Sequence, residues 1–341
     1  MAYLSGYTTR KKLTIDHTKV GATLTDFPVL VKLTDARFDW THANADGFDI
    51  RFTSSDGETL LKYERERHDG ADYAEYWVKI PSVSSSVDTD FYVYYRTTDT
   101  ADGADPTNVW DSAFKVVYHL KDLTTSTIED STAQNNDGAK ASANNPAEAD
   151  AQIAKGQDFS SDRIEIANKF LNGFAKLTVS FWIYADSAGT YNTVFSNWGS
   201  SNQNLTILFE SDSTLYCSLT DPEGDGAGGY FGGALSAGWN KIDFVWDGGN
   251  GVLLYKNGVY VETVNGGGTM GVLRTTTHNL WIGGQDGFSR NFDGKLDETR
   301  FSNSARSAHW ILASYHSEAD SLLNYGAEEI LATFIPQIIV H

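Results

Sequence analysis

The chain has 341 residues, about twice the length of a common single domain, so two domains are expected. Its 45 acidic and 26 basic residues give a formal net charge of -19. This balance argues against nucleic-acid binding, because a phosphate-binding surface needs clustered Lys and Arg side chains. Hydrophobic residues make up 40% of the chain and aromatic residues 13%. That is enough for sizeable cores and excludes a disordered chain.

The cysteine content and the N-terminal residues further restrict the class of protein. Cys217 is the single cysteine, which excludes an intrachain disulfide and a zinc site built on several thiolates. Residues 215–219 alternate like a strand, which predicts that Cys217 is a small buried side chain. Residues 1–7 lack the basic segment and apolar core of a signal peptide, and no apolar run reaches the roughly 18 residues of a membrane span. We therefore expect no membrane insertion and, for a protein acting outside cells, another route of export.

Residues 1–105 are predicted to form a compact β domain. Short apolar or alternating runs lie at residues 12–15, 27–33, 48–52, 76–80 and 91–95. Asp-Gly pairs separate several of them, and glycine supplies the positive φ that tight turns need. A polar stretch at 97–106 marks the end of the domain. Period-two patterning without a long helical segment predicts a β-sandwich or small barrel.

Residues 109–317 remain β in pattern. Predicted strands lie at residues 116–120, 163–166, 177–184, 204–209, 241–246, 252–255, 259–264, 279–283 and 295–301. Asn257-Gly258 predicts a tight hairpin, because both central positions of a type I′ turn favour this dipeptide. Many short antiparallel strands in one domain predict two stacked sheets, a jelly roll. The polar stretch at 124–158 is too long for an ordinary connection, so we expect either a functional loop or local structure there.

The end of the chain combines a helix with an apolar tail. Residues 304–317 are predicted to hold a short helix, with Ala308, Ile311, Leu312 and Tyr315 on one face. Residues 318–341 are predicted to be a tail whose last twelve residues are apolar and interrupted by a proline. Either this tail packs on its own domain or it docks on a partner chain.

The acidic residues do not predict an enzyme. Glycoside hydrolysis needs two carboxylates flanking one bond. Asp297 and Glu298 are adjacent on a predicted strand and so point to opposite faces. Glu64 and Glu66 share a face, but arginines crowd them in a polar hairpin. Nucleophile elbows, phosphate loops and dinucleotide fingerprints are also missing from the sequence, so we expect no catalytic residues.

One loop is suited to calcium. Residues 130–138 concentrate hard oxygen donors, which a cation with six to eight oxygen ligands requires. Asp130 and Asn136 are the candidate ligands. The alternative is an ordinary loop organised by Asx turns.

Four aromatic residues are candidates for carbohydrate contact: Trp198, Tyr230, Phe231 and Phe288. They lie in Gly- and Asn-rich segments rather than in apolar alternation. Such side chains are expected to be exposed and able to stack on sugar faces. Trp182, Trp246 and Trp281 alternate within predicted strands and are expected in the core.

Two stretches resemble known families. Residues 109–317 resemble the concanavalin A-like, laminin-G-type lectin/glucanase superfamily through VYHL at 117–120, DS at 130–131, NDG at 136–138, LTVSFWI at 177–183, WNK at 239–241, LYKNG at 254–258 and FDGKLDETRFS at 292–302. Residues 7–105 resemble an uncharacterised β domain that often precedes such lectin domains in bacterial, archaeal and phage surface proteins. The motifs are RKKLTI at 10–15, FPVLV at 27–31, DGFDIRF at 46–52, WVKIP at 77–81 and YVYY at 92–95.

The resemblance implies an all-β fold in three parts. These are an N-terminal β-sandwich at 1–105, a concanavalin A-like jelly roll with a short C-terminal helix at 109–317, and the tail at 318–341. In the lectin-like family, calcium often ties the early Asp-containing loop to the late Asp-Glu strand. This implies Ca²⁺ at Asp130, Asn136 and Asp297.

These features favour a non-enzymatic virion surface protein of a phage, either a tail or fibre adhesin or a capsid decoration protein. In this hypothesis it assembles in the host cytoplasm with other virion proteins, forms a homo-oligomer and contacts host-surface glycans through the lectin-like domain. One alternative is a secreted bacterial or archaeal glycan-binding protein, extracellular or on the cell surface. The other is a glycoside hydrolase whose carboxylate pair the patterns do not reveal.

Overall fold

The computed structural model describes residues 2–98, 101–122, 125–185, 192–198, 202–210, 214–232, 235–285 and 290–331. The chain forms two compact units. The first contains Met1–Val109 together with the chain from Asp320 onward, and the second contains Trp110–Ala319. The second unit is therefore inserted between two parts of the first.

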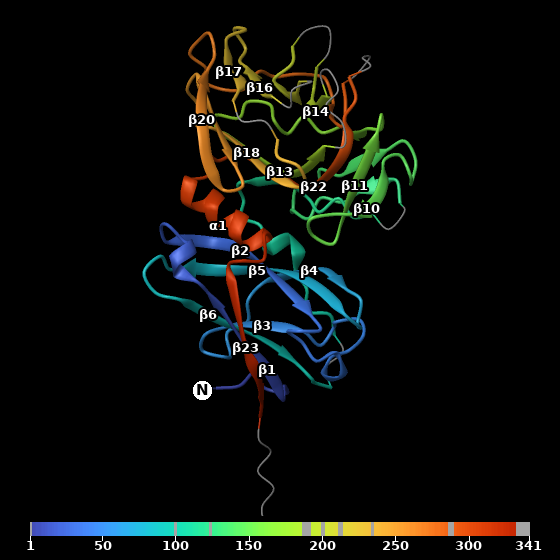
Figure 1. Ribbon diagram of the computed structural model, residues 1–341, viewed down its shortest axis with the longest axis vertical. Coiled ribbons are helices and arrows are strands. Elements are labelled where there is room, and N and C mark those ends of the chain that lie inside the picture. Colours follow the sequence, from blue (N-terminus) through green and yellow to red (C-terminus); the bar gives the residue numbers. More distant parts are fainter. Residues whose placement is uncertain are drawn as a thin grey trace, which may run out of the picture. The chain divides into compact units, whose positions relative to one another are not determined.

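The first unit is a β-sandwich of a four-stranded and a three-stranded antiparallel sheet (Figure 1). The larger sheet has the order β23-β1-β6-β3, formed by β23 Leu323–Ile330, β1 Thr9–Ile15, β6 Thr89–Tyr95 and β3 Arg51–Ser54. The smaller sheet has the order β2-β5-β4, formed by β2 Leu24–Thr34, β5 Tyr73–Val83 and β4 Tyr63–His68. Three 3-10 helices are η1 His17–Lys19, η2 Trp40–His42 and η3 Pro106–Asn108.

Aromatic side chains join these two sheets. The ring of Phe52 in β3 lies 5.2 Å from that of Tyr63 in β4 and 5.4 Å from that of Tyr76 in β5. All three side chains are buried. The predicted N-terminal β-sandwich is thus confirmed, and its core is formed by the inward-facing residues of alternating strands.

Strand β23 is the main departure from the predicted organisation. Residues 318–341 were expected to be a tail, yet Leu323–Ile330 pairs antiparallel with β1 in the first unit. In Figure 1 the red β23 runs beside the blue β1. Local patterning does not reveal this strand because its partner lies more than 300 residues away in the sequence. The apolar residues 332–341 lie outside the described part of the chain.

The second unit contains two eight-stranded sheets. The first, here called the β18 sheet, consists of β10 Ala147–Asp150, β11 Lys155–Ser160, β22 Asp293–Ser302, β13 Leu177–Ala185, β18 Asn240–Trp246, β19 Gly251–Lys256 and β20 Val259–Asn265, with β7 Phe114–Tyr118 also paired to β22. The second, here called the β16 sheet, consists of β17 Gly226–Phe231, β16 Leu215–Thr220, β15 Leu205–Phe209, β14 Asn192–Ser196, β21 Leu280–Ile282, β12 Ile164–Ile166, β9 Gly138–Lys140 and β8 Thr127–Ile128.

The two sheets of the second unit enclose one apolar core. Phe181 of β13 meets Phe195 of β14 at 5.0 Å between ring centroids, and Phe231 of β17 meets Phe244 of β18 at 5.3 Å. Each pair joins one sheet to the other, so the predicted jelly roll is confirmed. In the described part of the chain, no helix has the length and hydropathy needed to cross a membrane.

Two local predictions are also confirmed. Asn257 and Gly258 both have positive φ, at 51° and 78°, and join β19 to β20 as a hairpin. The polar stretch at 124–158 contains β8, β9 and β10 and the start of β11, so it has local structure of its own.

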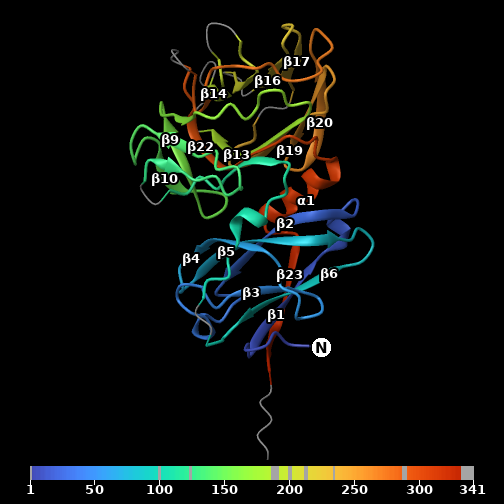
Figure 2. The ribbon, with the colours of Figure 1, turned by 180° about the vertical axis from the view of Figure 1, so that it is seen from behind.

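The predicted helix is α1, Ala308–Glu318, which begins after Ser307. The Ser307 hydroxyl accepts a hydrogen bond from the Trp310 amide, as an N-cap does. Ile311 is buried against Val245 and Tyr255, and α1 lies beside β20 in both Figure 1 and Figure 2. The predicted apolar face of the helix is only partly confirmed. Ala308, which was expected on that face, is exposed, whereas Ser314 and Glu318 are buried.

Candidate functional site

The outer face of the β16 sheet carries a row of aromatic and hydroxyl side chains. In β16 the residues alternate, so Leu215, Cys217 and Leu219 enter the core while Tyr216 and Ser218 point outward. Burial raises the pKa of the Cys217 thiol, as expected for a structural cysteine.

Antiparallel pairing places outward residues of three strands next to one another. Tyr216 lies opposite Leu208 of β15 and Tyr230 of β17, and Ser218 lies opposite Thr206. The rings of Tyr216 and Tyr230 are tilted, with centroids 4.8 Å apart. Cross-strand neighbours on one face form a continuous surface. The sheet thereby assembles an aromatic platform from residues 14 positions apart in the sequence.

A cavity of about 200 Å³ lies over this platform, here called the Trp198 cavity. Its described lining consists of Trp198, Gln203, Thr206, Leu208, Tyr216, Ser218, Tyr230, Gln285 and Arg290. Trp198 is 36% exposed and Tyr230 is 57% exposed, so both rings can meet a ligand. Amide, hydroxyl and guanidinium groups converge around them. This combination of aromatic surface and a few polar groups is typical of a small-molecule site.

Hydrogen bonds position several of these residues. The Trp198 amide donates to Ser196 Oγ at 2.9 Å, and the Tyr230 hydroxyl donates to Glu210 Oε1 at 3.3 Å. Thr206 is buried, and its Oγ1 has no hydrogen-bond partner among the described residues. Because buried hydroxyls are normally paired, this atom is suited to a ligand or water in the cavity.

An asparagine pair holds the two ends of the segment that carries Trp198. Asn197 Oδ1 accepts from the backbone amides of Asn204 and Leu205 at 3.0 and 3.1 Å. The Asn204 side chain donates to the Arg274 carbonyl at 2.8 Å. Both asparagines are buried. Their network anchors the chain on either side of the cavity wall.

The structure separates the four predicted aromatic residues. It brings Trp198 and Tyr230 to the same cavity. The expected exposure of Phe231 is wrong: the residue follows Tyr230 on β17 and therefore points inward, where it packs on Phe244. Phe288 lies outside the described residues. Sequence reasoning missed Tyr216, whose outward position could have been inferred from the alternation of residues 215–219.

Asp130 is committed to its own loop. Oδ1 accepts from the amides of Val117 and Thr132, both at 3.0 Å, and Oδ2 accepts from the Asn136 amide and the Thr132 hydroxyl, both at 2.9 Å. A carboxylate offers about four acceptor sites, and these four donors use them. Burial raises the pKa of Asp130, and the hydrogen bonds counter that rise. The Asp130 carboxylate therefore fits a loop anchor better than a calcium ligand.

The other two predicted calcium ligands have separate partners. The Asn136 side chain donates to the Lys115 carbonyl at 2.7 Å, and Asp297 Oδ2 accepts from the Ile153 amide at 2.7 Å. Among the described residues, groups of three or more His, Asp or Glu side chains with ligand atoms within 4.8 Å do not include Asp130 or Asp297. Among the described residues, Asn136 Oδ1 is buried without a hydrogen-bond partner, but one amide oxygen supplies only one of the six to eight ligands that calcium needs. The predicted donors thus do not fit a shared calcium site.

Replacing Asp130 with Asn should lower the free energy of unfolding by about 1 to 3 kcal/mol, because buried amides lose their acceptors. The loss should be the same in calcium and in EDTA, as measured by urea unfolding. Asp137→Asn, at an exposed position of the same loop, keeps an oxygen facing the Asp130 amide and is the matched control. Calcium that stabilises the native protein but not Asp130→Asn would contradict this expectation and support the metal hypothesis.

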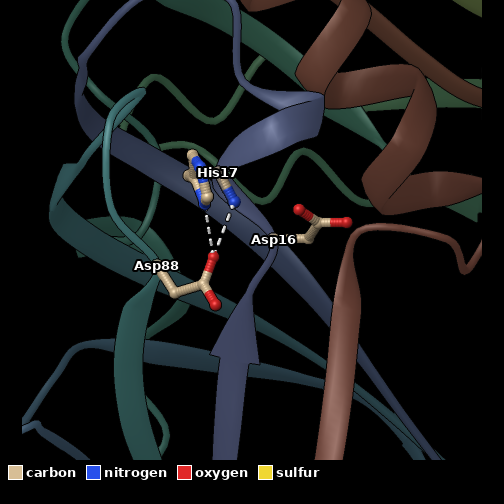
Figure 3. A group of neighbouring side chains, drawn as sticks. All are labelled: Asp16, His17 and Asp88. Carbon is tan, nitrogen blue, oxygen red and sulfur yellow. Dashed lines mark hydrogen bonds and ion pairs between the residues drawn. The ribbon is translucent and has the colours of Figure 1, made fainter.

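A second acidic group, not predicted from the sequence, lies in the first unit: Asp16, His17 and Asp88. In Figure 3 dashed lines join Asp88 to His17, through the ring nitrogen at 2.7 Å and the backbone amide at 3.1 Å. Asp16 Oδ1 accepts from the hydroxyl and amide of Thr18 at the start of η1. These hydrogen bonds lower the pKa of both carboxyls. Hydrogen bonds to the backbone at the start of η1 therefore explain why these three side chains lie together.

Two stretches of the chain match known families. Residues 158–312 match the family described as the concanavalin A-like lectin/glucanases superfamily. Residues 46–136 match a domain of unknown function (DUF2341). The chain therefore carries a concanavalin A-like domain, which includes the strands that form the Trp198 cavity. A search of proteins with curated functions found no match.

Several solved structures are similar to this chain at low sequence identity. The binding domain of Paraclostridial Mosquitocidal Protein 1 matches with a TM-score of 0.49 and 16% identity, over 60% of this chain and 52% of that one. Domain 4 of AbnA, a GH43 extracellular arabinanase from Geobacillus stearothermophilus solved with arabinotriose, matches with a TM-score of 0.47 and 19% identity, over 61% and 98%. The binding domain of Botulinum neurotoxin DC, solved with rat synaptotagmin II, matches with a TM-score of 0.46 and 14% identity, over 60% and 52%. The matches thus span about half the length of the two toxin binding domains.

Proposed function

We propose that the protein is a glycan-binding protein whose concanavalin A-like domain binds carbohydrate in the Trp198 cavity. The observation that carries this proposal is the convergence of Trp198, Tyr216 and Tyr230 on one cavity with hydroxyl and amide groups. The C–H faces of a sugar ring stack on aromatic rings, while its hydroxyls need hydrogen-bonding partners. The match of residues 158–312 to a lectin/glucanase superfamily supports the same conclusion.

The same cavity supports binding without hydrolysis. A glycosidase places two carboxyl groups about 5 to 9.5 Å apart on either side of the scissile bond. The described lining of the Trp198 cavity contains no Asp or Glu. Glu210 is not among the described lining residues and accepts a hydrogen bond from the Tyr230 hydroxyl. We therefore infer a non-enzymatic role, and reducing-sugar release from a polysaccharide panel would contradict it.

Loss of either exposed aromatic ring should weaken carbohydrate binding. A glycan array with the native protein identifies a ligand, whose Kd is then measured by titration calorimetry. Trp198→Ala and Tyr230→Ala should each raise this Kd at least ~10-fold, which corresponds to about 1.4 kcal/mol of lost stacking.

Tyr260→Ala is the matched control for this experiment. Tyr260 is 50% exposed but belongs to β20 of the other sheet. Its substitution should leave the Kd unchanged. Binding that is insensitive to Trp198 and Tyr230, or an array without any bound glycan, would count against the proposed site.

We further propose that the glycan-binding domain acts on the surface of a phage particle, in contact with host-surface glycans. The all-β two-unit architecture and the acidic composition, with a net charge of -19, support a soluble surface component. Detection of the protein in purified particles by mass spectrometry tests this placement. Detection only in the culture supernatant of uninfected cells would favour the secreted alternative.

A further inference from the structure

The first unit has a larger cavity, of about 690 Å³, here called the Trp40 cavity. It is lined by residues 35–41, Lys11 of β1, Ala71 and Glu328 of β23. Its volume lies within the range of small-molecule sites. Because β23 supplies Glu328, the cavity is complete only when the C-terminal strand is paired in the sheet.

Trp40 provides an aromatic wall in a defined orientation. Its indole Nε1 donates to Asp35 Oδ1 at 2.8 Å. The ring meets Phe38 edge-on at 4.9 Å and His68 edge-on at 5.6 Å between centroids, and it remains half-buried. Three contacts thus hold the ring before any ligand arrives. A preorganised ring loses little conformational entropy when a ligand stacks on it.

Lys11 lines the cavity and carries hydrogen-bond donors. Its side chain is buried, with 8% exposure of the residue, and its ammonium donates to the Arg37 carbonyl. Within the described part of the chain, this is the single hydrogen bond of the ammonium group. An ammonium group has three N–H donors, so this residue of the cavity lining keeps donor capacity. A polar ligand could use it without displacing an existing contact.

The carboxylates around the cavity already have donors of their own. Asp39 Oδ1 accepts from the Thr41 amide at 3.0 Å and hydroxyl at 2.6 Å. Glu328 accepts from the Tyr95 hydroxyl at 2.7 Å and from His42 Nδ1 at 3.0 Å. Together with Asp35, the cavity lining therefore holds three carboxylates. It also holds two cations, Lys11 and Arg37. This balance does not attract an anion, and it offers both donors and acceptors to neutral hydroxyl groups.

We propose that the Trp40 cavity is a second carbohydrate site, which takes a neutral sugar stacked on Trp40 and hydrogen-bonded by Lys11. This inference goes beyond the proposed function of the second unit and does not depend on it. Two sites in one chain would let the protein hold a glycan-covered surface more tightly than either site alone.

The test follows the indole signals of the tryptophans, labelled with ¹⁵N, by NMR. The Trp40 and Trp198 signals are assigned from Trp40→Phe and Trp198→Phe. The probes are glucose, galactose, mannose, N-acetylglucosamine, cellobiose and lactose, each raised to ~10 mM and above because simple sugars bind weakly. At least one probe should shift the Trp40 signal saturably. Lys11→Met should raise the Kd of that probe at least ~10-fold, since a charge-assisted hydrogen bond is lost.

The controls separate this site from the Trp198 cavity. In Tyr230→Ala the Trp40 shift should persist with an unchanged Kd, whether or not the first site binds sugar. Glucuronate serves as an acidic control probe. Three outcomes would overturn the inference: a Trp40 signal that no neutral probe moves, a shift that Lys11→Met leaves unchanged, or glucuronate binding more tightly than glucose. The last would show that the cavity selects anions rather than neutral sugars.

Discussion

A chain that ends at Ala319 is expected to lose the folded first unit while the second unit still folds. Removing β23 takes the edge strand from the four-stranded sheet and leaves β1 with unpaired backbone groups. The loss should exceed ~5 kcal/mol, which is comparable to the whole stability of a small domain. It is the largest effect anticipated for any change in this protein.

Side chains reinforce the backbone pairing between β23 and the rest of the first unit. The Arg10 guanidinium lies 4.3 Å from the ring centroid of Tyr3 and 4.1 Å from that of Tyr92, and its Nε donates to Glu329 at 2.8 Å. Tyr325 accepts a hydrogen bond from the Lys32 amide of β2 at 3.0 Å. The strand therefore contributes to both sheets of the sandwich. Its removal breaks contacts on each side of the core.

Limited proteolysis and thermal unfolding measure this effect. The shortened chain should be cleaved within residues 1–109 and resist cleavage within 110–319. A chain that ends at Leu331 keeps β23 and serves as the control. Adding a peptide of residues 320–331 should restore protection of the first unit. A shortened chain whose first unit stays protected without the peptide would contradict the assigned role of β23.

The second large effect is expected from Glu318→Gln, which should lower the free energy of unfolding of the second unit by about 3 to 5 kcal/mol. Glu318 is fully buried at the end of α1. Its Oε2 accepts from Trp182 Nε1 at 2.6 Å and from Lys241 Nζ at 2.8 Å, and its Oε1 accepts from Arg300 at 2.7 Å. Arg300 also pairs with Glu298, and Lys241 lies 3.8 Å from Asp243, so both cations keep one carboxylate in the variant. The substitution is severe because three buried donors lose a charged acceptor and face an amide that cannot accept from all of them.

The pH dependence has a defined sign. Burial acts to raise the pKa of Glu318, but the charges of Lys241 and Arg300 and the hydrogen bonds from Lys241 and Trp182 outweigh it and hold the pKa below its usual range. The carboxylate thus contributes stability that is fully present above its unfolded pKa of about 4.3 and is lost as the pH falls through the lower folded value. In Glu318→Gln this component of acid sensitivity below about pH 4 should disappear.

Asp150→Asn is the matched control for Glu318→Gln. Asp150 pairs with Lys155 at 2.6 Å, but its side chain is 92% exposed. Loss of a surface ion pair should change the stability by less than about 1 kcal/mol. Urea unfolding followed by tryptophan fluorescence compares the two variants, with separate transitions fitted for the two units. If both substitutions lowered the free energy of unfolding by the same amount, burial of Glu318 would not be the reason for its large effect.

Two adjacent residues on β17, Tyr230 and Phe231, show what the local sequence pattern did not predict. Tyr230 and Phe231 were both expected to be exposed, but neighbours on a strand point to opposite faces. Four of the six residues of Gly226–Phe231 are Gly or Ala, so the segment has too few large side chains to display the alternation of a strand. Pairing with β16 defines the strand and thereby separates the two rings.

The sequence by itself determined the class of fold. Period-two runs and Asp-Gly or Asn-Gly turns act over a few residues, so they predicted two β modules, the hairpin at Asn257-Gly258 and the inward position of Cys217. Tertiary structure alone decided three other features: the return of β23 to the first unit, the burial of Glu318, and the meeting of Trp198, Tyr216 and Tyr230. Each depends on partners distant in the sequence, such as Lys241 and Arg300 around Glu318. Local patterns carry no information about such partners, because strand pairing and helix packing bring them together only in the folded chain.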